Sequence, residues 1–186
     1  MSRTENIQVI PGFDLEEFMN LSHETRLSSE ALEHFGDLWN SWLPRLQAQQ
    51  IKSGQNSWLA IWLPEEVENE VDEAWAQSPG EGYLINALAQ YMCMSAVYEL
   101  LPQIADRGCA PAPKPHQDLK SALSGIGLGQ SDRDDLSISR RYAIVTYYPF
   151  RGGCEICSLQ ENCPKNRGES GFASLVLDGY ERGKDD

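Results

Sequence analysis

Three of the five cysteines in this chain lie within ten residues of one another, near its C-terminal end. Cys154, Cys157 and Cys163 are spaced C-x2-C-x5-C, and Pro164 follows directly. Thiolates held this close together in a reduced protein usually bind a metal, because soft sulfur ligands suit zinc and iron–sulfur clusters. The run is the most specific chemical signal in the sequence, and it predicts three ligands of a metal centre.

A fourth candidate ligand, Cys109, precedes this triad in a loop rich in proline, and 44 residues intervene. Structural zinc and iron–sulfur cubanes both take four protein ligands. Nothing in that loop demands a small apolar residue, which favours a ligand role for Cys109. His116, seven residues further on, is an alternative fourth ligand. The fifth cysteine, Cys93, lies in an apolar stretch, and we expect it to pack in the core.

The spacing favours an iron–sulfur cluster over zinc. Structural zinc sites usually combine two short knuckles, each with roughly two to four residues between its ligands. Here one such knuckle is joined by a partner six residues further on and by a remote cysteine, an asymmetry that suits a cubane. We therefore expect a [4Fe–4S] cluster, with Zn²⁺ or no metal as alternatives. Its predicted ligands are Cys109, Cys154, Cys157 and Cys163.

The triad resembles known iron–sulfur patterns. It is similar to the last three cysteines of the C-x6-C-x2-C-x5-C loop in endonuclease III-like DNA glycosylases. It also resembles the C-x4-C-x2-C-x5-C run in the molybdenum-donor protein of nitrogen fixation. A remote cysteine followed by the same triad resembles the cluster of CRISPR-associated and AddB-type nucleases. The resemblance covers about ten residues and one remote cysteine, and it implies cluster binding.

The departures from these families concern the first ligand and the catalytic residues. The first two patterns have a cysteine where this chain has Tyr147 or Pro149. The nuclease pattern has an Asp and Glu-x-Lys core between its first cysteine and the triad. The 44 residues between Cys109 and Cys154 are too few for that domain and contain no Glu-x-Lys. We therefore transfer no catalytic residue, and no phosphate-binding loop or hydrolase motif suggests one.

Charge restricts the choice of partner. A formal net charge of −13 argues against a general nucleic-acid binder, because neutralising phosphates requires clustered Lys and Arg. A run of acids without an intervening base predicts a solvated helix face or, alternatively, a docking surface for a basic partner. This acidic run consists of Glu65, Glu66, Glu68, Glu70, Asp72 and Glu73.

A chain of 186 residues suits one domain. We expect a mainly α fold, a single helical domain over 1–186 with a loop-rich, cysteine-containing C-terminal third. Within it, the helical body covers 1–107, the metal-binding region 108–178 and a polar tail 179–186.

Capping residues and apolar spacing predict helices that begin after Asp14, near Ser28 or Ser29, and at Pro64. A strongly apolar helix is expected at the centre, from about Tyr83 to Asp106. Two apolar stretches stay open between helix and strand on periodicity alone. They are 58–63 and 142–150.

These features predict a small soluble protein that acts as an accessory, redox-sensing, cluster- or metal-delivery or electron-transfer factor. Its partner would be a protein, such as a larger metalloenzyme system. No membrane span is expected, because polar residues interrupt the longest apolar stretch, and reduced thiols indicate the cytoplasm. The alternatives are a zinc-stabilised helical protein-interaction module and a nucleic-acid-processing enzyme with a structural cluster.

Overall fold

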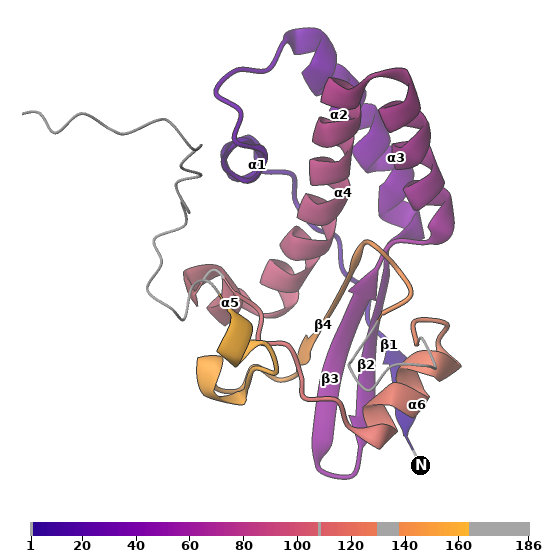
Figure 1. Cartoon of the computed structure of the whole chain (residues 1–186), viewed down its shortest axis with the longest axis vertical. Helices are drawn as coiled ribbons and strands as arrows, with labels where there is room; N and C mark the ends of the chain where they lie inside the picture. The colour runs from indigo at the N-terminus through magenta and orange to yellow at the C-terminus, as the bar shows by residue number, and fades with distance from the viewer. Residues whose placement is uncertain (1, 108, 130–137, 164–186) are drawn as a thin grey trace, which may run out of the picture.

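The computed structural model describes residues 2–107, 109–129 and 138–163, and contains both helices and a sheet (Figure 1). Within that part of the chain, six α-helices accompany a four-stranded antiparallel sheet of order β1-β2-β3-β4. The prediction of a mainly α fold is therefore wrong. The predicted polar tail, 179–186, lies outside the described residues, as does the last part of the predicted metal-binding region, 164–178.

The strands are β1 (Arg3–Asn6), β2 (Gln47–Ser53), β3 (Asn56–Trp62) and β4 (Ala143–Tyr147). The two stretches left open by the sequence largely correspond to β3 and β4. A two-residue turn joins β2 to β3, and Gly54 takes a φ of +57° there, which glycine adopts without strain.

The helices are α1 (Leu15–Ser22), α2 (Ser29–Trp42), α3 (Glu65–Gln77), α4 (Pro79–Leu100), α5 (Pro102–Arg107) and α6 (Gln117–Gly125). The predicted starts of the first two are confirmed, and α3 begins one residue after the predicted start, with Pro64 as its N-cap. The Asp14 carboxylate accepts the N–H of Glu17 at 3.0 Å, and the Ser28 hydroxyl accepts that of Ala31 at 3.1 Å.

The predicted central helix from Tyr83 to Asp106 is two helices. The first of them, α4, begins four residues earlier than predicted, at Pro79, because the Ser78 hydroxyl accepts the N–H of Glu81 and caps the helix. It ends at Leu100 because Pro102 has no N–H with which to continue the helical hydrogen bonds. The chain resumes as α5, which ends just before Cys109.

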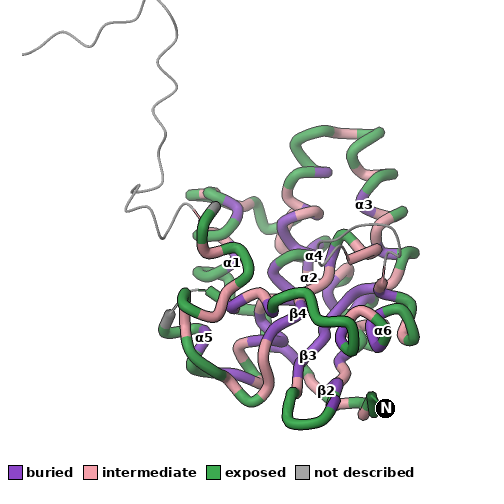
Figure 2. Tube along the Cα trace, turned by 60° about the horizontal axis from the view of Figure 1, so that its bottom comes forward, coloured by how far each residue is buried: buried purple, intermediate pink, exposed green. Residues whose placement is uncertain are grey.

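The sheet is covered by helices on both faces. On one face Leu59 and Ile61 of β3 join the core formed with α2, α3 and α4. On the other face Trp58 and Ala60 pack against α6. Figure 2 shows the buried residues running through α4 and β3, the two elements at the centre of the molecule. A strand that is apolar on both faces shows no alternation, which is why its sequence pattern is ambiguous.

Candidate metal centre

The four predicted ligands lie around one cavity. Its volume is about 410 Å³, and it is lined by the four cysteines together with Pro111, Gly153 and Gln160. The cysteine-bearing segments lie below α5 in Figure 1, next to the end of β4. The structure therefore brings Cys109 to the triad, although 44 residues separate them in the sequence.

Two short 3-10 helices set the spacing of the triad. Cys154 begins the first, η2 (Cys154–Ile156), and Cys157 follows it, donating its N–H to the Cys154 carbonyl at 3.1 Å. Cys163 likewise follows the second, η3 (Gln160–Asn162). The two residues between Cys154 and Cys157 therefore belong to one tight turn, η2. The five residues between Cys157 and Cys163 comprise a short link and the second turn, η3.

Gly152 provides the bend that leads into this loop. It has a φ of +61°, a conformation that a side chain disfavours. A Cβ atom there would also lie 2.8 Å from Glu155 Oε1 and 2.9 Å from Ile156 Cδ1. Close packing of the chain against η2 therefore favours glycine at this position.

The stretch 109–115, called here the connector, is hydrogen-bonded to β4 and to the segment 153–163, called here the cysteine loop. The Ser158 N–H donates to the Ala112 carbonyl at 2.9 Å. The buried Thr146 hydroxyl donates to the Pro111 carbonyl, also at 2.9 Å. Prolines remove N–H donors from the connector, so its carbonyls carry these contacts. Together they hold the connector, which carries Cys109, beside the cavity that Cys109 lines.

The four thiols line one open volume. Among the described residues, no group of three or more Cys, His, Asp or Glu side chains is arranged to hold a single metal ion. Four thiolates on one zinc would lie about 3.8 Å apart, given tetrahedral geometry and a Zn–S distance of about 2.3 Å. In a cubane each thiolate binds a different iron, so the four sulfurs would lie further apart than around one ion.

His116 has a different role. Its Nδ1 accepts the N–H of Asp118 at 3.3 Å and caps α6. It does not line the cysteine cavity within the described part of the chain. The structure therefore places Cys109, and not His116, beside the triad.

Cys93 lies in the core, as predicted, with 1% of its surface exposed. Burial raises the pKa of its thiol to about 12. Cys109 and Cys154, in contrast, are exposed, and none of the five cysteines forms a disulfide.

This difference predicts selective alkylation of the reduced, metal-free protein. At neutral pH, iodoacetamide should modify Cys109 and Cys154 readily and leave Cys93 unmodified, because the thiolate is the nucleophile and Cys93 is both protonated and inaccessible. Mass spectrometry of digested samples measures this. Adding denaturant should expose Cys93, whereas modification of native Cys93 at the rate of Cys109 would contradict its placement.

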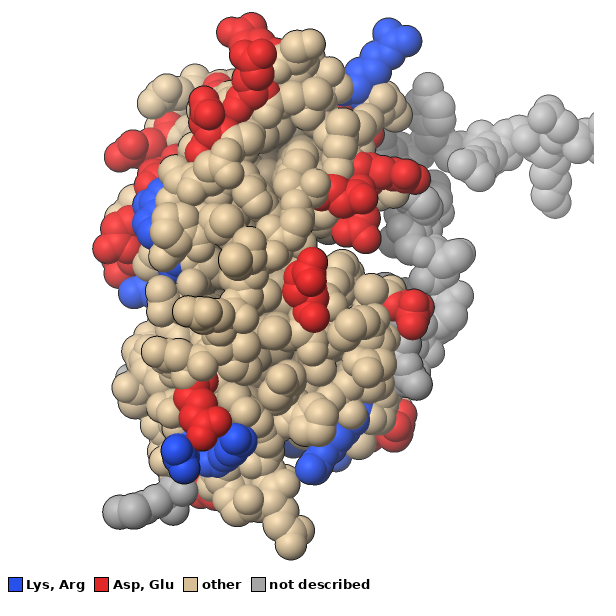
Figure 3. All heavy atoms as spheres, turned by 180° about the vertical axis from the view of Figure 1, so that it is seen from behind, with Lys and Arg blue, Asp and Glu red and all other residues tan. Residues whose placement is uncertain are grey.

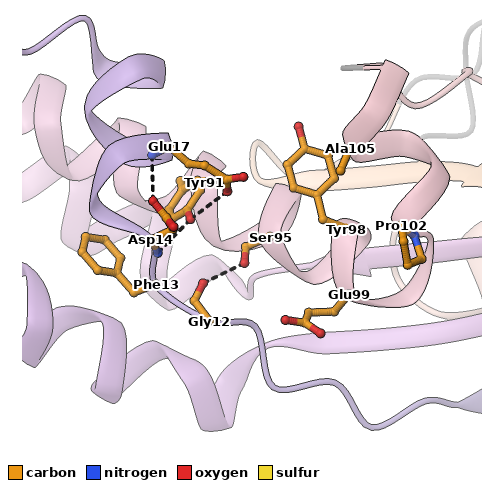
Figure 4. Close-up of a pocket in the computed structure, with 10 residues that line it drawn as sticks. All are labelled: Gly12, Phe13, Asp14, Glu17, Tyr91, Ser95, Tyr98, Glu99, Pro102 and Ala105. Atoms are coloured by element: carbon orange, nitrogen blue, oxygen red, sulfur yellow. Dashed lines mark hydrogen bonds between the residues drawn. The ribbon is translucent and has the colours of Figure 1, made fainter.

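A second cavity, of about 430 Å³, lies between the segment 12–17 and helices α4 and α5. Figure 4 shows Tyr91 at its wall, donating to Glu17 Oε2 at 3.1 Å and accepting the Asp14 N–H at 2.9 Å. Burial is the main cause that raises the pKa of Tyr91 to about 12. Ser95 donates to the Gly12 carbonyl at 2.8 Å. These bonds attach the N-terminal segment to α4, which is a structural role that no local motif signals.

The acidic run lies on α3, where three arginines pair with four of its acids. Arg45 contacts Glu70 at 2.7 Å, Arg141 contacts Asp72 at 2.6 Å, and Arg140 lies 2.9 Å from Glu65 and 3.9 Å from Glu68. Figure 3 shows acidic side chains (red) and basic side chains (blue) next to one another along one edge of the molecule. The arginines come from distant parts of the sequence, so the run is less suited to a basic partner than its sequence suggests.

Glu70 gives a pH-dependent prediction. Burial raises the pKa of its carboxyl, but hydrogen bonds from Arg45 and Trp42 outweigh this and hold the pKa below its usual 4.5. A lowered pKa stabilises the fold above pH 4.5, and this stabilisation is lost as pH falls through the folded-state value. Glu70→Gln should cost about 1 kcal/mol at pH 7. The difference from wild type in urea unfolding should shrink below pH 4.5, and a constant difference would contradict this role.

Comparisons with protein-family models, with characterised proteins and with solved structures find no match for this chain. Among the described residues, no helix is both long enough and apolar enough to span a membrane. Functional inference therefore depends on the residues and their arrangement.

Proposed function

We propose that this chain binds one [4Fe–4S] cluster through Cys109, Cys154, Cys157 and Cys163. The observation that carries the proposal is that all four thiols line one cavity. Two independent segments, the connector and the cysteine loop, supply them. Cys93, a buried thiol that packs in the core, does not line this cavity.

The spacing of the cysteines favours a cluster over zinc. Structural zinc sites usually combine two short knuckles, whereas this chain has one short knuckle, one wider step and a remote cysteine. A cubane binds one thiolate at each of four separate irons, so its ligands surround a volume. Zinc that pins the cysteine loop to the helices is the second candidate, favoured only by the short Cys154–Cys157 spacing.

Exposure of the thiols favours exchange with a partner protein. Cys109 and Cys154 are exposed, while Cys157 and Cys163 are half-buried. A centre held there lies near the surface, where it is accessible to a docking protein and to oxidants. An iron–sulfur cluster supplies one-electron redox chemistry. This position suits an accessory factor that transfers electrons, senses redox state or delivers a cluster to a larger metalloenzyme system.

The experiment is anaerobic reconstitution followed by metal analysis. The protein is incubated with iron, sulfide and reductant, desalted, and assayed for iron, sulfide and zinc, with EPR of the reduced sample. We expect about four iron and four sulfide per chain and the EPR signal of a reduced cubane. A colourless product that retains one zinc per chain would refute the proposal and support the zinc alternative.

A further inference from the structure

Tyr147, the last residue of β4, lies between the two segments that carry the cysteines. Its hydroxyl accepts the N–H of Lys114, in the connector, at 3.3 Å. The same hydroxyl donates to the carbonyl of Ile156, in η2, at 3.4 Å. One phenolic oxygen is therefore hydrogen-bonded both to the segment of Cys109 and to the turn between Cys154 and Cys157.

The ring of Tyr147 is fixed independently of its hydroxyl. It packs against the core between the sheet and α6, together with Ile126 and Ala143. Tyr147 also pairs with Trp58 in the β3–β4 ladder. The sheet thus holds the phenol in place, and the phenol in turn contacts the two segments at the cavity.

We propose that Tyr147 is a positioning residue for the metal centre, which sets the separation between Cys109 and the Cys154–Cys157 turn. The effect on the cluster rests on the proposed function, whereas the effect on the connector does not. Tyr147 need not contact the cluster. It acts by limiting how far the connector can move away from η2.

Two further hydrogen bonds hold the connector among the described residues. Ser158 bonds Ala112 through main-chain atoms, so side-chain substitution leaves that bond in place. Thr146 bonds the connector at Pro111. Tyr147 therefore offers a side-chain test in which a single oxygen is removed and the aromatic packing stays.

The test compares Tyr147→Phe with Tyr148→Phe. Phenylalanine keeps the ring at both positions. Tyr148 is the next residue in the chain, and it packs against the helical core on the opposite side of the sheet. The control thus loses the same atom without changing a contact between the connector and η2.

The first measurement uses the metal-free protein and amide hydrogen exchange by NMR. Tyr147→Phe should speed exchange of the Lys114 amide by about threefold to tenfold, or roughly 0.6–1.4 kcal/mol, because the acceptor of that N–H is lost. Tyr148→Phe should leave the rate unchanged. An unchanged Lys114 rate in Tyr147→Phe would overturn the proposal whether or not a cluster is bound.

The second measurement uses the reconstituted protein. Iron release to a chelator should be about threefold to tenfold faster in Tyr147→Phe than in wild type or Tyr148→Phe. The reduced EPR spectrum should change as well, although the thermal unfolding of the metal-free protein stays close to that of the control. Faster Lys114 exchange with wild-type iron release would overturn the positioning role at the centre. Failure of wild type to bind iron would instead refute the proposed function. The exchange measurement would still show whether Tyr147 restrains the connector.

Discussion

Replacing Cys157 by serine should lower the iron content of the reconstituted protein by more than about tenfold. Changes to residues that merely support a metal ligand already cost roughly 10–100-fold in affinity, so loss of a ligand should cost at least as much. Cys157 closes the tight turn that begins at Cys154, and the two are the most closely spaced pair of candidate ligands in the sequence. Iron and sulfide analysis after anaerobic desalting measures the effect.

Two further variants make this result specific. Cys93→Ala removes a thiol that lies in the core with a raised pKa, and it should leave iron binding unchanged. Cys109→Ser should give a bound cluster that oxygen destroys faster, since the triad stays intact and the connector is held by other contacts. Full iron binding by Cys157→Ser would exclude Cys157 as a ligand, and wild-type oxygen stability of Cys109→Ser would exclude Cys109.

Trp42→Ala should destabilise the fold by about 3–5 kcal/mol, a large part of the total stability of a typical domain. Trp42 is completely buried at the end of α2. Its indole N–H donates to Glu70 Oε2 at 2.6 Å. Truncation would leave a cavity in the helical core and remove a charge-assisted hydrogen bond. Equilibrium urea unfolding, followed by far-UV circular dichroism, measures the change.

Trp75→Ala provides the matched control. The same side chain is removed, but Trp75 is 40% exposed on α3, and alanine is a good helix former. One side of Trp75 packs against Gly82 of α4, so we expect a measurable loss that is clearly smaller than that of Trp42→Ala, because part of the Trp75 side chain already contacts water. Equal losses for the two variants would contradict the placement of Trp42 in the core and of Trp75 at the surface.

The helices of the first half were predictable from local chemistry. The cap at Asp14 and the cap at Ser28 are formed as the sequence indicates. The sheet was not predictable in the same way. β2 is rich in glutamine, and β3 is apolar on both faces, so neither shows the alternation of a half-buried strand. The glycine turn at Gly54 was the available signal for the hairpin.

The candidate site was predictable in composition but not in arrangement. Short spacing marks Cys154 and Cys157 as neighbours. The approach of Cys109 depends on hydrogen bonds from Ser158 and Thr146 to the connector, which no local pattern encodes. The same limit applies to the acidic run, whose arginine partners lie up to 75 residues away in the chain.

The central claim concerns what lies between Cys109 and the triad, and anomalous diffraction tests it most directly. Crystals of the anaerobically reconstituted protein would be measured just above and just below the iron absorption edge. The account predicts iron density inside the cavity, within bonding distance of the four cysteine sulfurs. Iron density elsewhere, or density in the cavity that appears only above the zinc edge, would contradict it.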